Sequence, residues 1–422
     1  TQLLPEKFLG QNTYQYLQSA LAVPEQPGKV TTADILWHGD PAKFPFAKND
    51  GIFQAQINVT DTHFLFAQGW PSLTELSLQL FFENSDLTMT APSAQLLDVH
   101  INDLEASIPG LSKDSLLTIN ASAAGTGFAL SEVMKNSNLK DSLGKLLTEN
   151  IIISNQLSAN LQLEIPFYNA PVVTKGNIEL PNNYIVFNDI DTTLSQTKGT
   201  ISFVNDTVSI ADLSANLLGQ PITIDAETQR QEDSYAVNIG LNGDWDSTEL
   251  IGQLSSTYAE ATAGSAAWEA NIDLAFLTEG FTYDFSVSSN LNGIQINLAA
   301  PFNKTKDANT PFIVLGNGNN KNLNLQAQIG SDIKFEGVLP YSEGQFSRAH
   351  LALGNSEFAG LGMGFSISAN LPEMYVDEWY ETLDILLRDV QQQTQQANLF
   401  NTPERIFIDT AALHIAGQTI HN

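Results

Sequence analysis

The six histidines are the first residues to test for chemistry: His38, His63, His100, His350, His414 and His421. None stands in the H-x-x-x-H or H-E-x-x-H spacing that brings two imidazoles onto one metal ion, and no tight carboxylate cluster accompanies them. His63 and His100 fall in strand-like stretches. We therefore expect solvated or hydrogen-bonded histidines and no metal site.

Other motifs for catalysis or cofactor binding are missing or weak. The sequence has no G-x-S-x-G nucleophile elbow and no G-x-x-x-x-G-K-[ST] phosphate loop. The glycine-rich run 360–364 leads into a strand pattern, which favours close strand packing over a phosphate cradle. Asp189-Ile190-Asp191 and Asp244-Trp245-Asp246 are isolated D-x-D pairs, more typical of solvated turns than of calcium sites. We expect no enzyme activity and no cofactor.

Charge and composition narrow the class further. The 422 residues include 18 Lys and Arg against 47 Asp and Glu, a net charge of −29, which argues against nucleic acid as a partner. Without cysteine there is no disulfide framework, thiolate nucleophile or Cys-ligated metal. Charged residues make up only 15% of the chain, below the usual quarter or so, and the polar residues are largely Ser, Thr, Asn and Gln. This balance is typical of exposed β-structure.

Strict alternation of apolar and polar residues is the dominant pattern. It is clear at residues 53–59, 157–165, 268–274, 322–329 and 363–369. Because successive side chains of a strand point to opposite faces, each segment predicts a strand with one apolar and one polar face. Turn residues such as Asn84-Ser85-Asp86 and Asn205-Asp206 separate the strands at short intervals, which favours antiparallel hairpins. The pattern predicts roughly two dozen strands.

Three segments have helical spacing instead and divide the chain into sections. We expect an N-terminal helical segment at 1–30, a first β section at 31–130, an amphipathic helix at 131–149, a second β section at 150–371, a C-terminal amphipathic helix at 372–398, and a truncated β unit at 399–422. Pro372 is placed where the first turn of a helix tolerates proline.

An internal repeat underlies the β sections. Residues 82–89 match residues 203–210 at an offset of 121 (203 − 82), and the same offset carries Ala94-Gln95-Leu96-Leu97 onto Ala215-Asn216-Leu217-Leu218. Gly417-Gln418-Thr419-Ile420 resembles Gly219-Gln220-Pro221-Ile222. We therefore expect the sequence to end partway through a third copy of the repeat. A strand–turn–strand unit is therefore expected to recur without slippage.

The large apolar face of so many amphipathic strands must be covered, and three helices can cover only a fraction of it. Two sheets could pack about 10 Å apart into self-filled sandwiches. Alternatively, one sheet could bend into a trough whose inner face is available to an apolar ligand. Composition leaves both arrangements open.

Several segments carry a family resemblance. They are residues 34–39 (DILWHG), 64–74 (FLFAQGWPSLT), 335–340 (FEGVLP) and 360–365 (GLGMGF). In this order they resemble the YhdP family, the large AsmA-like proteins of Gram-negative envelopes. The family's proteins are far longer and have an inner-membrane anchor, so the chain resembles an internal, periplasmic section of them.

The resemblance implies a mainly β fold: an elongated, curled antiparallel sheet, a taco-like trough with an apolar groove and a few amphipathic helices. It implies a monomeric section of a periplasmic bridge that conducts glycerophospholipid acyl chains between inner and outer membranes, and a longer parent protein anchored in the inner membrane. The alternative is a structural or adhesive β-repeat protein with self-filled sandwich domains and no lipid cargo. The helix at 376–390 could gate the groove or pack permanently on the sheet.

The residues expected to line the groove are the apolar positions of the alternating strands. They are Phe53, Ile57, Val59, Leu76, Leu78, Leu80, Phe82, Leu161, Leu163, Ile165, Leu213, Leu217, Ile272, Leu274, Leu323, Leu325, Phe365 and Ile367. Ordinary core packing is the competing interpretation for each of them.

Overall fold

The fold is described from a computed structural model. It describes residues 28–421 apart from 67, 113, 139, 141–143, 169, 189–191, 232–233, 255–258, 278, 357–359 and 393–401; before residue 28 it describes only 11, 14, 15 and 18. The chain divides into two compact units, Thr1–Leu217 and Leu218–Asn422. The boundary between the units falls within the expected section 150–371. Of the helices in the described residues, none has the length and apolarity that crossing a membrane requires.

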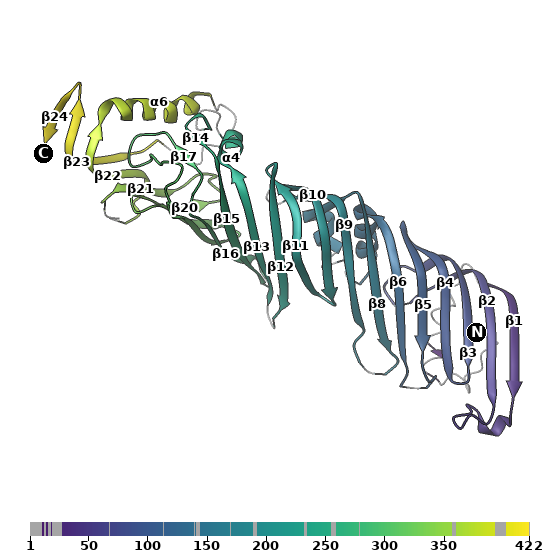
Figure 1. Ribbon diagram of the computed structural model, residues 1–422. Helices are drawn as coiled ribbons and strands as arrows, with labels where there is room; N and C mark the ends of the chain where they lie inside the picture. Colours follow the sequence, from purple (N-terminus) through teal and green to yellow (C-terminus); the bar gives the residue numbers. More distant parts are fainter. Residues whose placement is uncertain are drawn as a thin grey trace. The chain divides into compact units, whose positions relative to one another are not determined.

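Unit 1 is an antiparallel meander in which consecutive strands pair with one another (Figure 1). Its strands are β1 (Lys29–His38), β2 (Ile52–Phe64), β3 (Leu73–Glu83), β4 (Asp86–Leu96), β5 (Val99–Ile108), β6 (Leu116–Thr126), β7 (Ile151–Ser154), β8 (Gln156–Pro166), β9 (Val173–Phe187), β10 (Thr192–Val204) and β11 (Thr207–Leu217). β6 pairs with β8, while β7 pairs with the far half of β9. The helical elements are η1 (Pro41–Lys43), α3 (Gly127–Lys135) and a π-helical turn, η3 (Leu146–Asn150).

Unit 2 continues the same design with two parallel pairings near its end. Its main strands are β12 (Gln220–Arg230), β13 (Ser234–Asp246), β15 (Ser265–Leu277), β16 (Phe281–Ser289), β18 (Phe312–Asn319), β19 (Asn322–Ile329), β20 (Ile333–Pro340), β21 (Arg348–Gly354), β22 (Gly364–Tyr375), β23 (Arg405–Ile415) and β24 (Gln418–His421). β21–β22 and β22–β23 are parallel, and α6 (Val376–Gln392) belongs to the crossover between the latter pair. α4 (Ser247–Leu254) follows β13, and β14 (Thr262–Ala263) and β17 (Gln295–Ile296) form a separate small sheet.

The prediction of a mainly β fold built from antiparallel hairpins is confirmed, while the curling of the sheet stays a prediction. The helix boundaries differ from those expected. α3 begins at Gly127 because the Oγ1 of Thr126 caps it by accepting from the Ala129 N–H at 3.1 Å. Pro372 lies in β22, not in a helix, and α6 begins only at Val376. The helical stretch expected near the N-terminus, and Leu139 and Leu143 of the second, lie largely or wholly outside the described residues.

The 121-residue repeat is visible in the backbone. Positive φ angles occur at the paired positions Glu75 and Gln196 (both 52°), Asn84 and Asn205 (54° and 53°), and Leu97 and Leu218 (51° and 52°). Non-glycine residues seldom adopt this conformation, so its recurrence at one offset is unlikely to arise by chance. Bulges and turns therefore recur in step with the strands.

Candidate functional site

The apolar side chains of unit 1 align across its strands. Residues directly opposite in an antiparallel pair share a face of the sheet, so the ladder can be followed from strand to strand. One such row runs from β5 to β11 through Ile101, Ala123, Ala159, Ile178, Ile201 and Ile210. The row crosses the strands, and every member is apolar.

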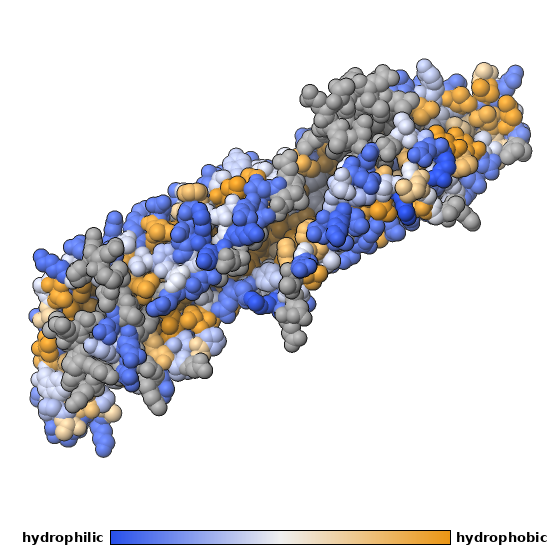
Figure 2. Space-filling view, turned by 180° about the vertical axis from the view of Figure 1, so that it is seen from behind, coloured by the Kyte–Doolittle hydropathy of each residue, from blue (hydrophilic) through white to orange (hydrophobic). Residues whose placement is uncertain are grey.

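A longer row crosses unit 2. It contains one residue from each main strand between β12 and β23: Ile224, Leu241, Ala270, Val287, Val314, Ala327, Phe335, Leu351, Ile367 and Ile406. With strands about 4.8 Å apart, nine steps make an apolar path on the order of 40 Å long within this unit. On the face shown in Figure 2, hydrophobic residues lie at the bottom of a hollow and hydrophilic residues form its margins.

The opposite face of the strands is mostly polar, although Ile313 and Leu315 also lie on it, and its polar side chains form hydrogen bonds with one another across the strands. Gln54 donates to Glu83 at 2.7 Å, and Asn324 donates to Asn317 at 2.9 Å across the β18–β19 pair. These ladders satisfy polar groups at the water-exposed surface. The two faces of each sheet thus have opposite solvation.

The apolar face is not equally accessible in the two units. Among the predicted lining residues, those buried by protein are Ile57, Leu76, Leu78, Leu80, Phe82, Ile165 and Leu213. Those only partly buried are Phe53, Val59, Leu161, Leu163, Leu217, Ile272, Leu274, Leu323, Leu325, Phe365 and Ile367. All six predicted residues of unit 2 are in the second group, so its apolar face is the more open one.

In unit 1 the connection between β2 and β3, described at residues 65, 66 and 68–72, covers part of the face of β3–β6. Phe66 and Trp70 of this β2–β3 connection pack on the core, with ring centroids 5.7 Å apart. Asn138, beyond α3, donates to the Gln68 carbonyl at 2.8 Å and ties the connection to the segment that follows the helix. Leu76 and Leu80 belong to the cluster on which these rings pack, and they are only 1% and 3% exposed.

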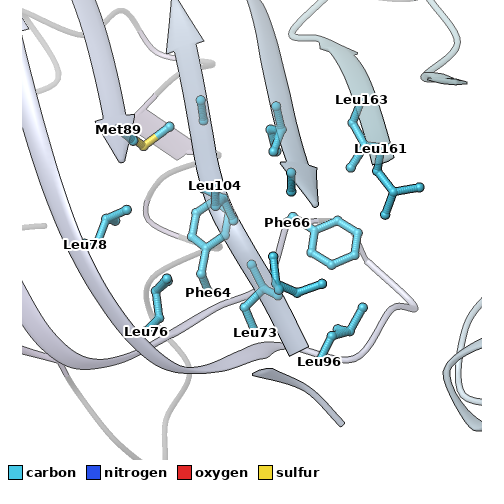
Figure 3. Close-up of a pocket in the computed structure, with 14 residues that line it drawn as sticks. Phe64, Phe66, Leu73, Leu76, Leu78, Met89, Leu96, Leu104, Leu161 and Leu163 are labelled. Atoms are coloured by element: carbon cyan, nitrogen blue, oxygen red, sulfur yellow. The ribbon is translucent and has the colours of Figure 1, made fainter. Parts of the chain in front are cut away.

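A small apolar pocket lies under this cover. Phe64 and Phe66 bound it together with side chains of β3–β6 and β8, including Leu161 and Leu163 (Figure 3). Its volume is about 70 Å³, which is smaller than the cavity of roughly 150 Å³ that holds one benzene molecule. The unit's own side chains therefore fill most of the apolar space here, and an acyl chain would have to displace some of them.

In unit 2 the helix α6 is fastened at one side of the apolar face. Trp379 contacts Phe302 with ring centroids 6.1 Å apart, and both pack on the cluster of Ile333, Leu353, Ala369 and Leu371. Thr382, 2% exposed, accepts a hydrogen bond from the Ala299 N–H at 2.8 Å. These contacts favour a helix packed on the sheet over a gate.

The titratable groups form no reactive arrangement in the part of the chain that is described. His350 is buried on the polar face, with Nδ1 2.7 Å from the Ser366 hydroxyl and Nε2 2.9 Å from the Ser368 hydroxyl, and burial lowers its pKa. Burial also lowers the pKa of Lys304, whose Nζ donates to the carbonyls of Ile294 and Thr305. Among the described residues, no three His, Asp or Glu side chains are placed to hold a metal ion.

These observations define a class of protein: a β-sheet protein with a long apolar face and a mostly polar opposite face. The chain belongs to the YhdP family, whose sequence model, described as "YhdP protein", matches residues 2–422. This confirms the resemblance seen in the sequence.

A curated relative agrees with the family assignment. The chain is 30% identical over 421 residues, 99% of its length, to the "Intermembrane phospholipid transporter YhdP" of Escherichia coli (strain K12). It spans 32% of the length of that relative, whose name is that of a transporter and not of an enzyme. No solved structure matches the chain.

Proposed function

We propose that this chain is a section of a phospholipid-conducting bridge in the cell envelope, which holds acyl chains along its apolar face. The proposal is based mainly on the apolar row of unit 2, which crosses every main strand from β12 to β23. Of its ten residues, Ile224 and Ala270 are buried, and the other eight are partly buried or exposed. The name of the relative from Escherichia coli supports phospholipid as the cargo.

The energetics of transfer fit such a face. Each methylene kept from water is worth about 0.8 kcal/mol, so exposing an acyl chain of about sixteen carbons costs on the order of 12 kcal/mol. A continuous apolar row removes most of this cost at every step without a nucleophile, a metal or a nucleotide. The net charge of −29 disfavours tight capture of anionic headgroups, so headgroups would stay in water.

The finer parts of the proposal concern the setting. The section would lie in the periplasm, within a longer protein anchored in the inner membrane, and conduct glycerophospholipids between inner and outer membranes. The 32% coverage of the relative is consistent with an internal section of a longer bridge.

The structural or adhesive β-repeat protein remains a second candidate, because one observation favours it. The apolar face of β3–β6 is sealed by its own side chains and the β2–β3 connection, as in a self-filled domain. If unit 2 closed in the same way, no lipid would be carried.

Mass spectrometry of lipids extracted from the purified protein distinguishes the lipid conduit from the structural protein. The 422-residue chain, purified from a bacterial host without detergent, should yield phospholipid in a reproducible ratio to protein. A matched preparation of an unrelated acidic β-protein controls for carry-over. Repeated preparations free of lipid would refute the conduit and leave the structural role.

A further inference from the structure

Four aromatic side chains of the apolar face lie directly opposite glycines of a neighbouring strand. The pairs are Phe203–Gly176, Trp268–Gly243, Tyr283–Gly318 and Phe285–Gly316. A Cβ on Gly316 would overlap with Phe285 Cε1, and one on Gly318 would stand 2.5 Å from the Tyr283 hydroxyl oxygen. At Gly316 the Phe285 ring itself is the nearest group and occupies the space where β18 would carry a side chain. At the other three glycines a backbone carbonyl oxygen is nearest, and the opposite ring lies within about 3 Å as well.

Backbone conformation does not account for these glycines. All four lie within regular strands, and none has a positive φ. Glycine inside a strand costs stability because it loses more chain entropy and has no side chain to pack. The close approach of a ring is the feature that a larger residue would prevent.

The arrangement is most developed on β16. Phe281, Tyr283 and Phe285 alternate along the strand, with consecutive centroids 6.2 and 6.3 Å apart and ring planes inclined by 30° and 15°. The rings of Tyr283 and Phe285 reach over β18, and the Tyr283 hydroxyl is hydrogen-bonded to that of Tyr341. Rings that lean over the next strand do not stand up from the sheet.

We propose that glycines opposite aromatic residues set the depth of the apolar groove, with Gly316 as the determining position in unit 2. The inference rests on the proposed function. A side chain at residue 316 would push the Phe285 ring off β18 and into the space above the apolar face. An acyl chain lying over Ile272, Phe285 and Leu325 would then meet an upright ring.

The test measures lipid occupancy at two positions of the full chain. Leu325, opposite Gly316, and Ile178, in unit 1, are each replaced in separate samples by the photoreactive residue p-benzoylphenylalanine. Cross-linking to phospholipid in cells is compared with and without Gly316→Val. We expect at least a fivefold loss of cross-linking at residue 325 and none at residue 178. Gly240→Val is the matched control, because a Cβ there meets nothing closer than 3.8 Å.

A second-site substitution distinguishes a change in groove depth from a general loss of folding. Adding Phe285→Ala to Gly316→Val removes the displaced ring, and cross-linking at residue 325 should return to within twofold of the unsubstituted chain. Gly316→Ala gives a graded variant should the valine prevent folding, and thermal unfolding is recorded for all variants. Unchanged cross-linking in Gly316→Val, or failure of the double variant to recover, would overturn the inference.

The outcomes also distinguish this inference from the proposed function. Cross-linking at residue 178 but not at 325 in the unsubstituted chain would overturn the role of Gly316 and keep the lipid conduit. Cross-linking at neither position would overturn both.

Discussion

Asn84 closes its hairpin onto Phe53 through two hydrogen bonds. Its side-chain oxygen accepts from the Phe53 N–H at 3.0 Å, and its own N–H donates to the Phe53 carbonyl at 2.8 Å. Asn205 makes the same pair of bonds with Thr174, at 2.9 and 2.7 Å. Both asparagines have positive φ, and both pairs are related by 121 residues (205 − 84 and 174 − 53). The repeat therefore conserves a tether between hairpins as well as a strand pattern.

This tether predicts the order of stabilities at residue 205. Asn205→Gly loses the side-chain bond but keeps the backbone conformation, and should cost about 1 kcal/mol. Asn205→Ala adds the strain of a left-handed alanine, about 1 kcal/mol more. Urea unfolding of both variants checks the order, and equal stabilities would mean that the positive φ carries no cost here.

Because the apolar face is more buried in unit 1 than in unit 2, replacing a leucine by aspartate should have different effects in the two units. Leu80→Asp places a carboxylate in a side-chain position only 3% exposed, and should cost about 4 kcal/mol or more of folding free energy. Leu325→Asp, on the partly exposed face of unit 2, should leave the chain folded and remove its bound lipid. Circular dichroism melts and lipid mass spectrometry check both, with Gln326→Asp on the polar face as the control. Unfolding of the Leu325 variant would instead indicate a sealed core.

The position of Phe66 in the β2–β3 connection predicts that its ring limits the volume of the pocket beneath it. Phe66→Ala should enlarge the cavity of about 70 Å³ and cost about 2 kcal/mol, since the ring is only partly buried. The variant should take up more of an apolar fluorescent probe such as N-phenyl-1-naphthylamine. Phe128→Ala, at a ring 68% exposed, is the control and should change neither property. Equal probe uptake by both variants would show that the connection is not a cover.

Burial of His350 predicts a loss of stability in mild acid. Because burial, with a smaller contribution from Arg405, lowers its pKa below 6.5 against the opposing effect of Glu336, the unfolded state binds the proton more readily. The contribution is fully present above the unfolded pKa and falls as the pH drops below about 6.5 towards the folded pKa. Urea unfolding of the wild type and of His350→Gln between pH 7.5 and 5 measures this contribution. The free energy of unfolding of the wild type should fall more steeply with decreasing pH than that of the variant. A pH dependence as steep in the variant as in the wild type would contradict this.

Alternation in the sequence was sufficient to place the strands and their apolar faces, because period two depends only on side-chain direction. The segment with Trp268, Ala270, Ile272 and Leu274 is β15, and its apolar residues share one face. Pro372 was misplaced because a proline before a helical stripe is also compatible with the end of a strand, and β22 extends to Tyr375.

Differences in exposure along the face could not be predicted in this way. They depend on tertiary packing: Leu76 and Leu80 belong to a core cluster on which Phe66 and Trp70 pack, whereas Leu325 is only partly buried. The pairing of Phe285 with Gly316 was equally hidden, because the two residues are 31 positions apart (316 − 285) and only the register of β16 with β18 sets them opposite.

Since the apolar rows cross the strands at right angles, the hairpin becomes the natural increment of evolution in this fold. Gaining or losing two strands shifts no alternation and reverses no face, yet changes the reach of the row by roughly 10 Å. The asparagine tethers recur after 121 residues, once between β3 and β4 and once between β10 and β11, so the duplication that they mark comprised several hairpins together.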